Sequence, residues 1–145
     1  MLGGGAAVLS FVLISPDRAA AALPSVSAFR NPGCGCCEQW AQRMKQAGFA
    51  VTMTDDPELD RRRAGLGVPA NIAGCHLAAA GGYLLEGHVP PEDVLRLLRE
   101  KPEARGLAVP GMPVGSPGME GGGGGEPFDV LLFAADGTWK VFASH

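Results

Sequence analysis

Three of the four cysteines in the chain lie within residues 34–37, in the order Cys-Gly-Cys-Cys. The short apolar segment before them, residues 26–29, is followed by Arg-Asn-Pro-Gly, a turn-forming sequence, and predicts a β-strand. After them, Trp40 and Met44 stand at helical spacing, which predicts a helix over residues 37–47. The chain must therefore fold so that a strand passes into a helix through a sulfur-rich turn.

The rest of the chain alternates between strand and helix patterns. In residues 49–54 the large apolar side chains alternate with one alanine and two threonines, which is typical of a strand. Gly81 and Gly82 suit a two-residue hairpin turn, and Pro91 suits the first position of a helix. The elements predicted after the first helix are strand 49–54, a polar exposed helix 57–64, strands 77–80 and 83–85, helix 91–101, and strands 130–134 and 138–143.

A long stretch rich in glycine and proline, residues 102–127, is predicted to be irregular, with a flexible and unpacked glycine run at 121–125. The two strands after it are joined at Asp136 and Gly137, a strong hairpin signal. The order of the predicted elements fits an α/β protein. We expect a thioredoxin-like mixed sheet with flanking helices and an extra C-terminal β-hairpin.

Residues 1–22 have the character of a signal peptide rather than of a folded domain. A short apolar run is followed by small residues at 19–22, so we expect the mature chain to start near Leu23 and to form a single domain over 23–145. The run is too short for a stable membrane span. No Lys or Arg precedes Arg18, so either the start codon is misassigned or the signal is atypical. A poorly ordered apolar tail is the alternative to a signal peptide. Export implies the periplasm or the cell surface, where thiols meet an oxidising environment.

The charged residues give no sign of a nucleic-acid partner. The formal net charge is −3 and no basic stripe is present. The run Arg61, Arg62 and Arg63 is predicted to be a solvated helix face. His145, the C-terminal residue, is also predicted to be solvated.

Cys34 and Cys37 have the CxxC spacing of redox-active thiols. At the start of a helix the backbone N–H groups and the helix dipole favour a thiolate, so a lowered thiol pKa is expected. This spacing at a strand–helix junction is a redox signature, and it keeps a thiol–disulfide oxidoreductase that uses Cys34 and Cys37 as an alternative function. A structural disulfide without further function is a second alternative.

Cys36 is not needed for thiol–disulfide exchange, which uses two sulfurs. A third sulfur beside the CxxC pair indicates thiolates that bridge a soft metal ion. Cys75 supplies a fourth sulfur, and a loop before the third strand is expected to lie opposite the first three. Four thiolates could also hold tetrahedral Zn(II), but the Cys-x-Cys-Cys spacing lacks the two separated pairs of ordinary zinc modules.

Two methionines and a histidine extend the candidate ligand set. Met112 and Met119 stand among Gly and Pro in the long irregular stretch, where a thioether is free to bind Cu(I); adaptable packing is the alternative. His88, between a strand end and a helix start, is a candidate ligand. The role of His76, either a ligand or a group that orients Cys75, stays open.

Several motifs, spread from about residue 26 to 142, carry a likeness to a known family. They are found at residues 31–37, Trp40, 48–49, 66–69, 75–76, 82–83, 86–90, 106–113 and 115–120. With these motifs the chain resembles the CopG-type copper-resistance family, many members of which carry only an unknown-function label. It departs from the family at Gly74 and Leu77, where hydroxyl residues are expected, and in the run 121–125.

This resemblance implies a thioredoxin-like fold, a periplasmic location and copper bound in a cysteine-rich site that can interconvert Cu(I) and Cu(II). Copper ions, with other periplasmic copper-handling proteins, are the expected partners. Whether the protein only sequesters copper or turns over as a copper oxidoreductase stays open. Carried onto this chain, the expected ligands are Cys34, Cys36, Cys37, Cys75, His88, Met112 and Met119.

Overall fold

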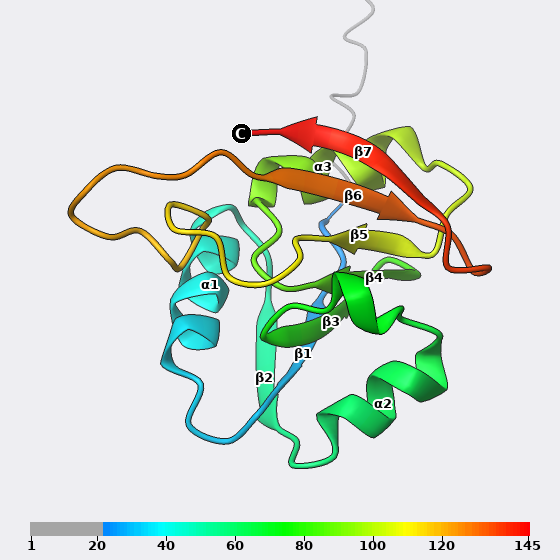
Figure 1. The fold of residues 1–145 in the computed structure, drawn as a ribbon, viewed down its shortest axis with the longest axis horizontal. Coiled ribbons are helices and arrows are strands. Elements are labelled where there is room, and N and C mark those ends of the chain that lie inside the picture. The colour runs from blue at the N-terminus through cyan, green and yellow to red at the C-terminus, as the bar shows by residue number, and fades with distance from the viewer. Residues whose placement is uncertain (1–21) are drawn as a thin grey trace, which may run out of the picture.

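A seven-stranded mixed sheet organises residues 22–145, the part of the chain that the computed structural model describes (Figure 1). The predicted signal-peptide-like segment therefore lies, apart from Ala22, outside the described residues. Within residues 22–145 no helix has the length and apolarity needed to cross a membrane. The elements are β1 Val26–Arg30, α1 Gly35–Gln46, β2 Val51–Asp55, α2 Leu59–Leu66, the 3₁₀ turn η1 Ala70–Ile72, β3 His76–Ala80, β4 Tyr83–Glu86, α3 Pro91–Glu100, β5 Gly106–Ala108, β6 Asp129–Phe133 and β7 Trp139–Ser144.

The strands lie in the order β2-β1-β3-β4-β5-β6-β7. The pairs β1/β2 and β4/β5 are parallel, and the other four pairs are antiparallel. β7, red in Figure 1, forms one edge of the sheet as the second strand of the predicted C-terminal hairpin. The α/β class, the mixed sheet with helices and the extra hairpin are thus confirmed, whereas the thioredoxin-like assignment stays a prediction.

Both faces of the sheet are covered, because side chains alternate along each strand. In β6, Val130 and Leu132 enter one hydrophobic cluster, while Leu131 and Phe133 enter another. Helices α1 and α3 contribute to the first cluster, and α2 with η1 contributes to the second. The sheet is therefore a central layer between two helical layers.

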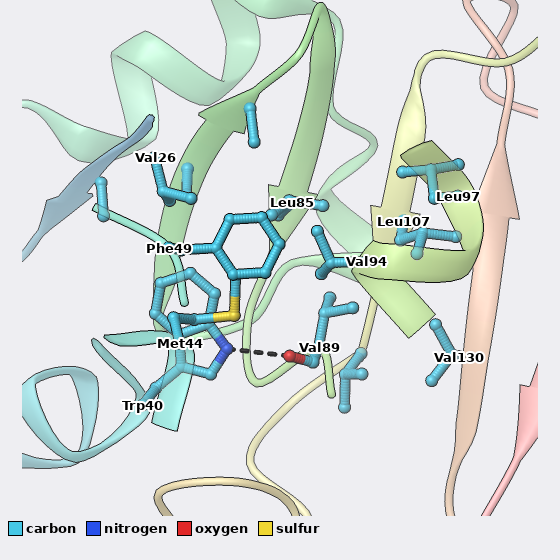
Figure 2. Close-up of a cluster of buried hydrophobic side chains, with 14 of the residues drawn as sticks. Val26, Trp40, Met44, Phe49, Leu85, Val89, Val94, Leu97, Leu107 and Val130 are labelled. Carbon is cyan, nitrogen blue, oxygen red and sulfur yellow. Dashed lines mark hydrogen bonds between the residues drawn. The ribbon is translucent and has the colours of Figure 1, made fainter. Parts of the chain in front are cut away.

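Helix α1 is anchored to the first cluster by Trp40. Figure 2 shows Trp40 and Met44 of α1 beside Val89, and both α1 side chains are fully buried. The indole Nε1 donates a hydrogen bond of 2.9 Å to the carbonyl oxygen of Val89. Helix α1 also begins at Gly35, two residues earlier than predicted, so that Cys36 lies in its first turn rather than in a loop.

The prediction that residues 102–127 are wholly irregular is wrong, because they contain β5. This three-residue strand pairs with β4 on one side and β6 on the other, so it joins the C-terminal hairpin to the rest of the sheet. Three residues are too few to show a period-2 pattern, and their strand conformation depends on the two neighbours. After β5 the chain runs directly toward Met112.

His145 is exposed to solvent, as predicted, but it also contacts two other parts of the fold. Its backbone exchanges two hydrogen bonds with Phe128, and its ring stacks on the Phe128 ring at 5.1 Å between centroids. His145 Nε2 lies 2.7 Å from a carboxylate oxygen of Asp93, which is buried in the first turn of α3. The end of the described chain is therefore held against α3.

Gly106 provides a test of the role of β5. A Cβ atom at this position would overlap the backbone carbonyl of Leu84, so Gly106→Ala must displace β4 or β5. We expect a loss of unfolding free energy of at least about 1–3 kcal/mol, the usual cost of overpacking. Equilibrium unfolding in urea measures this loss.

Gly65→Ala is the matched control. Gly65 lies in α2 with open space around its Cβ position, so this change should stabilise the protein by about 0.4–1 kcal/mol. Equal stability of the two variants would contradict the assigned role of β5.

Candidate metal centre

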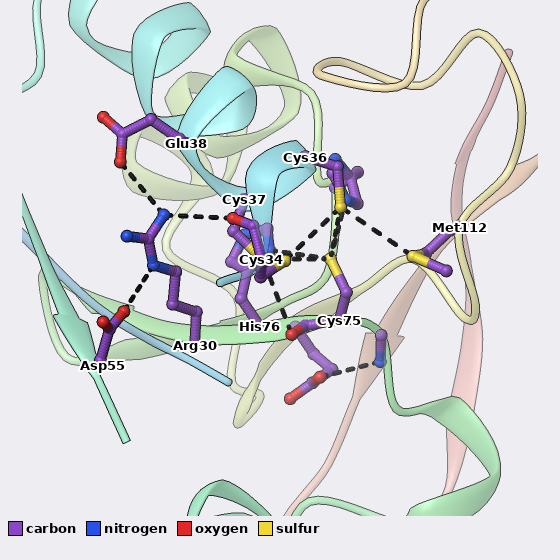
Figure 3. The surroundings of a disulfide bond; sticks show 12 residues. Arg30, Cys34, Cys36, Cys37, Glu38, Asp55, Cys75, His76 and Met112 are labelled. Atoms are coloured by element: carbon purple, nitrogen blue, oxygen red, sulfur yellow. Dashed lines mark hydrogen bonds and ion pairs between the residues drawn. A yellow bond between two sulfur atoms is a disulfide. The ribbon is translucent and has the colours of Figure 1, made fainter. Parts of the chain in front are cut away.

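Four cysteine sulfurs converge where α1 begins and β3 starts (Figure 3). Cys34 precedes α1, Cys36 and Cys37 lie in its first turn, and Cys75 immediately precedes β3. The Cys34–Cys36 and Cys37–Cys75 sulfur distances are each 3.5 Å, and the Cys36–Cys75 distance is 3.8 Å. All four Sγ atoms, which we call the sulfur cluster, lie within 4.8 Å of one another. The expectation that Cys75 lies opposite the other three is confirmed.

The structure shows the sulfur cluster in an oxidised form. Cys34 and Cys37 are joined by a disulfide, whereas Cys36 and Cys75 are free thiols. In this form two of the four sulfurs cannot act as thiolate ligands. Reduction of one bond by two electrons makes all four available at the same place.

Arg30, at the end of β1, fixes the start of α1. Its guanidinium donates a hydrogen bond of 3.1 Å to the carbonyl oxygen of Cys34. The same side chain forms ion pairs with Glu38 and Asp55, at 3.2 Å and 2.7 Å (Figure 3). Arg30 therefore ties the first turn of α1 to β1 and β2.

Cys75 is positioned through the backbone of Gly74. A Cβ at Gly74 would lie 2.5 Å from the Cα atom of Gly87 and 3.1 Å from the carbonyl oxygen of Val109. Gly74 also forms a parallel bridge to Gly111. The site at which a hydroxyl residue was expected therefore has no room for any side chain, and this close packing restricts where the sulfur of Cys75 can lie.

An ion pair between α2 and β4 also holds the backbone at Gly74, next to Cys75. Arg63 Nη2 and Glu86 Oε1 are 2.8 Å apart, and both side chains are almost fully buried. Arg63 donates to the carbonyl oxygen of Gly74, while Glu86 Oε1 accepts from the Gly74 amide, each at 2.8 Å. Burial raises the pKa of the Glu86 carboxyl, and Arg63 opposes this shift.

The prediction that Arg61, Arg62 and Arg63 form a solvated face is wrong for Arg63. Only 7 % of Arg63 is exposed, because its position on α2 turns it toward the sheet. Nothing in a run of three arginines distinguishes the third. The charge of Glu86, at the end of an apolar strand, is the one signal in the sequence that could have indicated a buried partner.

The two candidate methionines differ in position. Met112 follows the bridge at Gly111, and its Sδ lies 4.0 Å from the sulfur of Cys36 (Figure 3). Its side chain is 52 % exposed, so it lies at the mouth of the cluster. Met119 follows Gly118, which packs against Trp40. Among residues 22–145 its thioether accepts no hydrogen bond from a cysteine thiol, and a ligand role for Met119 stays a prediction.

Two histidines flank Cys75 on the buried side. His88 Nε2 lies 2.8 Å and His76 Nδ1 lies 3.3 Å from its sulfur. His88 Nδ1 lies 2.7 Å from the carbonyl oxygen of Pro117, which can only accept, so this nitrogen carries the proton. The lone pair of Nε2 therefore faces Cys75. Burial lowers the pKa of His88 and, more strongly, that of His76, which His88 also lowers.

The donor atoms fit a soft metal ion. Thiolate, thioether and neutral imidazole suit copper, zinc and related ions, whereas magnesium and calcium prefer oxygen. Burial, followed by the nearby Cys36, raises the pKa of the Cys75 thiol. A bound cation would replace the thiol proton and supply the positive charge that this buried sulfur lacks.

The buried histidines predict how stability depends on pH. Because folding lowers the pKa of His76 and His88, the unfolded chain binds more protons below their ordinary value of 6.5. The unfolding free energy of the metal-free protein should therefore fall as the pH decreases from about 7 to about 5, by up to about 1.4 kcal/mol per pH unit for each histidine. Urea unfolding at several pH values measures it. An unfolding free energy that does not change with pH, or whose pH dependence is the same in His88→Gln, would contradict the lowered histidine pKa values.

Known proteins are similar to this chain in both sequence and fold. A family described as "Protein of unknown function, DUF411" matches residues 72–119. No curated protein matches the chain. Two solved structures, "Copper resistance protein copG" in Form 1 and Form 2, are each 38% identical to it; both matches cover 84% of this chain and 98% of the other, with TM-scores of 0.79 and 0.80. At this identity and coverage, the chain belongs to the CopG copper-resistance family.

Proposed function

We propose that this protein is a periplasmic copper-binding protein that holds Cu(I) in its sulfur cluster. The convergence of all four cysteine sulfurs within 4.8 Å, from two distant parts of the chain, is the observation that carries the proposal. The names of the two similar structures, both copper resistance proteins, support it. The proposed ligands are Cys34, Cys36, Cys37, Cys75, His88, Met112 and Met119.

The chemistry of the donors favours Cu(I) over Zn(II). Two thiolates already carry more negative charge than one Cu(I) ion can neutralise, so a cluster of four thiolates suits several ions that share sulfurs. The Met112 thioether beside Cys36 is neutral and soft, which makes it a ligand for Cu(I) and a poor one for zinc. A closed tetrahedral zinc site would have no use for it.

The Cys34–Cys37 disulfide makes the proposed copper binding dependent on redox state. Loading of the full cluster requires the reduced form of Cys34 and Cys37, and the oxidised form leaves Cys36 and Cys75. A site with both sulfur and imidazole donors can accommodate Cu(I) and Cu(II), which supports interconversion of the two states in copper resistance. Other periplasmic copper-handling proteins are the proposed partners.

A thiol–disulfide oxidoreductase is the second candidate, because the structure joins Cys34 and Cys37 in a disulfide. Such an enzyme needs neither Cys36 nor Met112. Their positions, 3.8 Å from Cys75 and 4.0 Å from Cys36 respectively, therefore favour copper binding.

Replacement of Cys36 by serine separates the two candidates. The change leaves the Cys34–Cys37 pair intact, so a reductase should keep most of its activity. A thiolate-bridged copper cluster should instead lose bound Cu(I) ions per protein. Anaerobic Cu(I) titration of reduced protein against a chromophoric chelator measures the stoichiometry. Unchanged stoichiometry with retained disulfide reductase activity would reject the copper cluster.

Replacing the methionines by leucine is predicted to weaken Cu(I) binding without changing the stability of the metal-free protein. Met112→Leu keeps apolar bulk at an exposed position, so the metal-free melting temperature should stay the same. Loss of the thioether should weaken Cu(I) binding about tenfold, or about 1.4 kcal/mol. The double variant with Met119→Leu should bind more weakly still. Competition titrations measure both, and an affinity equal to that of the parent would remove these methionines from the site.

A further inference from the structure

Residues 114–126, between β5 and β6, form a closed loop whose two ends are bonded to each other. The Val114 amide donates to Glu126 Oε1 at 2.8 Å, and the Glu126 amide donates to the carbonyl oxygen of Val114 at 2.9 Å. Just inside these ends, a Cβ at Gly115 would lie 2.6 Å from the Cα atom of Gly125. A surface loop that packs on itself in this way can move as one unit.

The first half of this loop, residues 115–120, is held together by its own hydrogen bonds, and we call it the clasp. The Gly115 amide donates to the carbonyl oxygen of Met119 at 2.9 Å. The Met119 amide in turn donates to the carbonyl oxygen of Ser116, a fully buried residue, at 2.7 Å. The second half is different, because residues 122–124 have open space around each Cβ position. A compact clasp is thus followed by an unpacked glycine run.

Few contacts hold the clasp against the domain, beside α1 (Figure 1). Among the described residues outside 113–126, two side chains form hydrogen bonds with it. Arg43 Nε of α1 donates to Glu120 Oε1 at 2.8 Å, and His88 Nδ1 donates to the carbonyl oxygen of Pro117 at 2.7 Å. The Arg43 and Glu120 side chains are 46% and 42% exposed, and exposed ion pairs contribute little to stability.

The closest packing between the clasp and α1 is made by Gly118. A Cβ at this position would lie 2.6 Å from the amide nitrogen of Trp40 and 2.9 Å from the carbonyl oxygen of Cys36. Glycine is also favoured here by its φ of +91°. Because Gly118 inserts no side chain into α1, the clasp can separate from the helix without withdrawing one.

We propose that the clasp is a lid that opens from α1 as a unit and sets the rate at which copper enters and leaves the protein. When closed, it is bonded through Pro117 to His88, a proposed ligand whose side chain is fully buried, and it holds Met119. Opening breaks the two outer hydrogen bonds but none inside the clasp, so it requires far less free energy than global unfolding. The inference rests on the proposed function for the ion that passes, but not for the movement.

The ring N–H of His88 reports this movement without any metal. It is buried and bonded to Pro117, so its proton exchanges with water when the clasp opens. Arg43→Glu replaces the attraction to Glu120 by repulsion and should speed this exchange roughly three- to tenfold in oxidised, metal-free protein. NMR of protein labelled with ¹⁵N in its histidine rings measures the rate, and the signal missing from His88→Gln assigns it.

Two variants are controls for the charge change. Lys45→Glu makes the same change at an exposed position of the same helix and should exchange at the parent rate. Arg43→Lys keeps the positive charge and should stay close to the parent. Gly118→Ala, which forces the clasp away from Trp40, provides the same test if Arg43→Glu does not fold. Urea unfolding verifies that each variant is folded.

Transfer of Cu(I) from the reduced protein to excess bathocuproine disulfonate tests the control of copper. In Arg43→Glu the transfer should accelerate by the same factor as the ring exchange. The equilibrium Cu(I) affinity should stay the same, because the substitution loosens the clasp equally with and without copper. Lys45→Glu should transfer copper at the parent rate.

Ring exchange that both Arg43→Glu and Gly118→Ala leave unchanged would overturn the movement of the clasp. Faster ring exchange with unchanged Cu(I) transfer would overturn its control of copper. Either result, with intact Cu(I) binding by the parent, would leave the proposed function in place. Failure of the reduced parent to bind Cu(I) would overturn the proposed function, whereas the ring exchange of His88 in metal-free protein would still decide whether the clasp opens.

Discussion

The buried ion pair between Arg63 and Glu86 is the interaction on which the rest of the site depends. It connects α2 to the end of β4, and both partners bind the backbone of Gly74. Removal of one partner from such a pair typically costs about 3–5 kcal/mol, because the other charge stays buried without compensation. Since Cys75 is the next residue, the same contacts that stabilise the domain determine where its sulfur lies.

Around Cys75 the site changes in character from the surface to the interior. Met112 and Cys36 lie at the exposed side, and the imidazoles of His76 and His88 lie at the fully buried side. Soft sulfur donors therefore face the mouth of the site, and borderline nitrogen donors form its base. The single sulfur of Cys75 contacts a donor of each kind, the sulfur of Cys36 and a ring nitrogen of His76.

The redox state of the Cys34–Cys37 pair determines how many thiolates the sulfur cluster can offer. With Cys34 and Cys37 joined, the free thiols are Cys36 and Cys75, each held by a separate part of the fold. Reduction of this disulfide would free two more sulfurs at the start of α1, which Arg30 holds through the carbonyl oxygen of Cys34. The described residues thus offer two free thiols when this disulfide is formed and four when it is reduced.

Much of the fold and of the candidate site could be predicted from the sequence, because several of their features depend on local sequence patterns. The strand–cysteine–helix junction, the two hairpins and the buried face of α1 follow from periodicity and turn residues, and the motifs around Cys75 and His88 indicate the CopG family. By contrast, β5 is a strand only because two neighbouring strands pair with it. Arg63 is buried and Arg62 is exposed only because α2 packs on the sheet with the side that carries Arg63. Met112 and Met119 have similar local sequences, but among the described residues only the Met112 thioether accepts a hydrogen bond from the Cys36 thiol. These differences are decided by contacts between residues distant in the chain, which no local pattern contains.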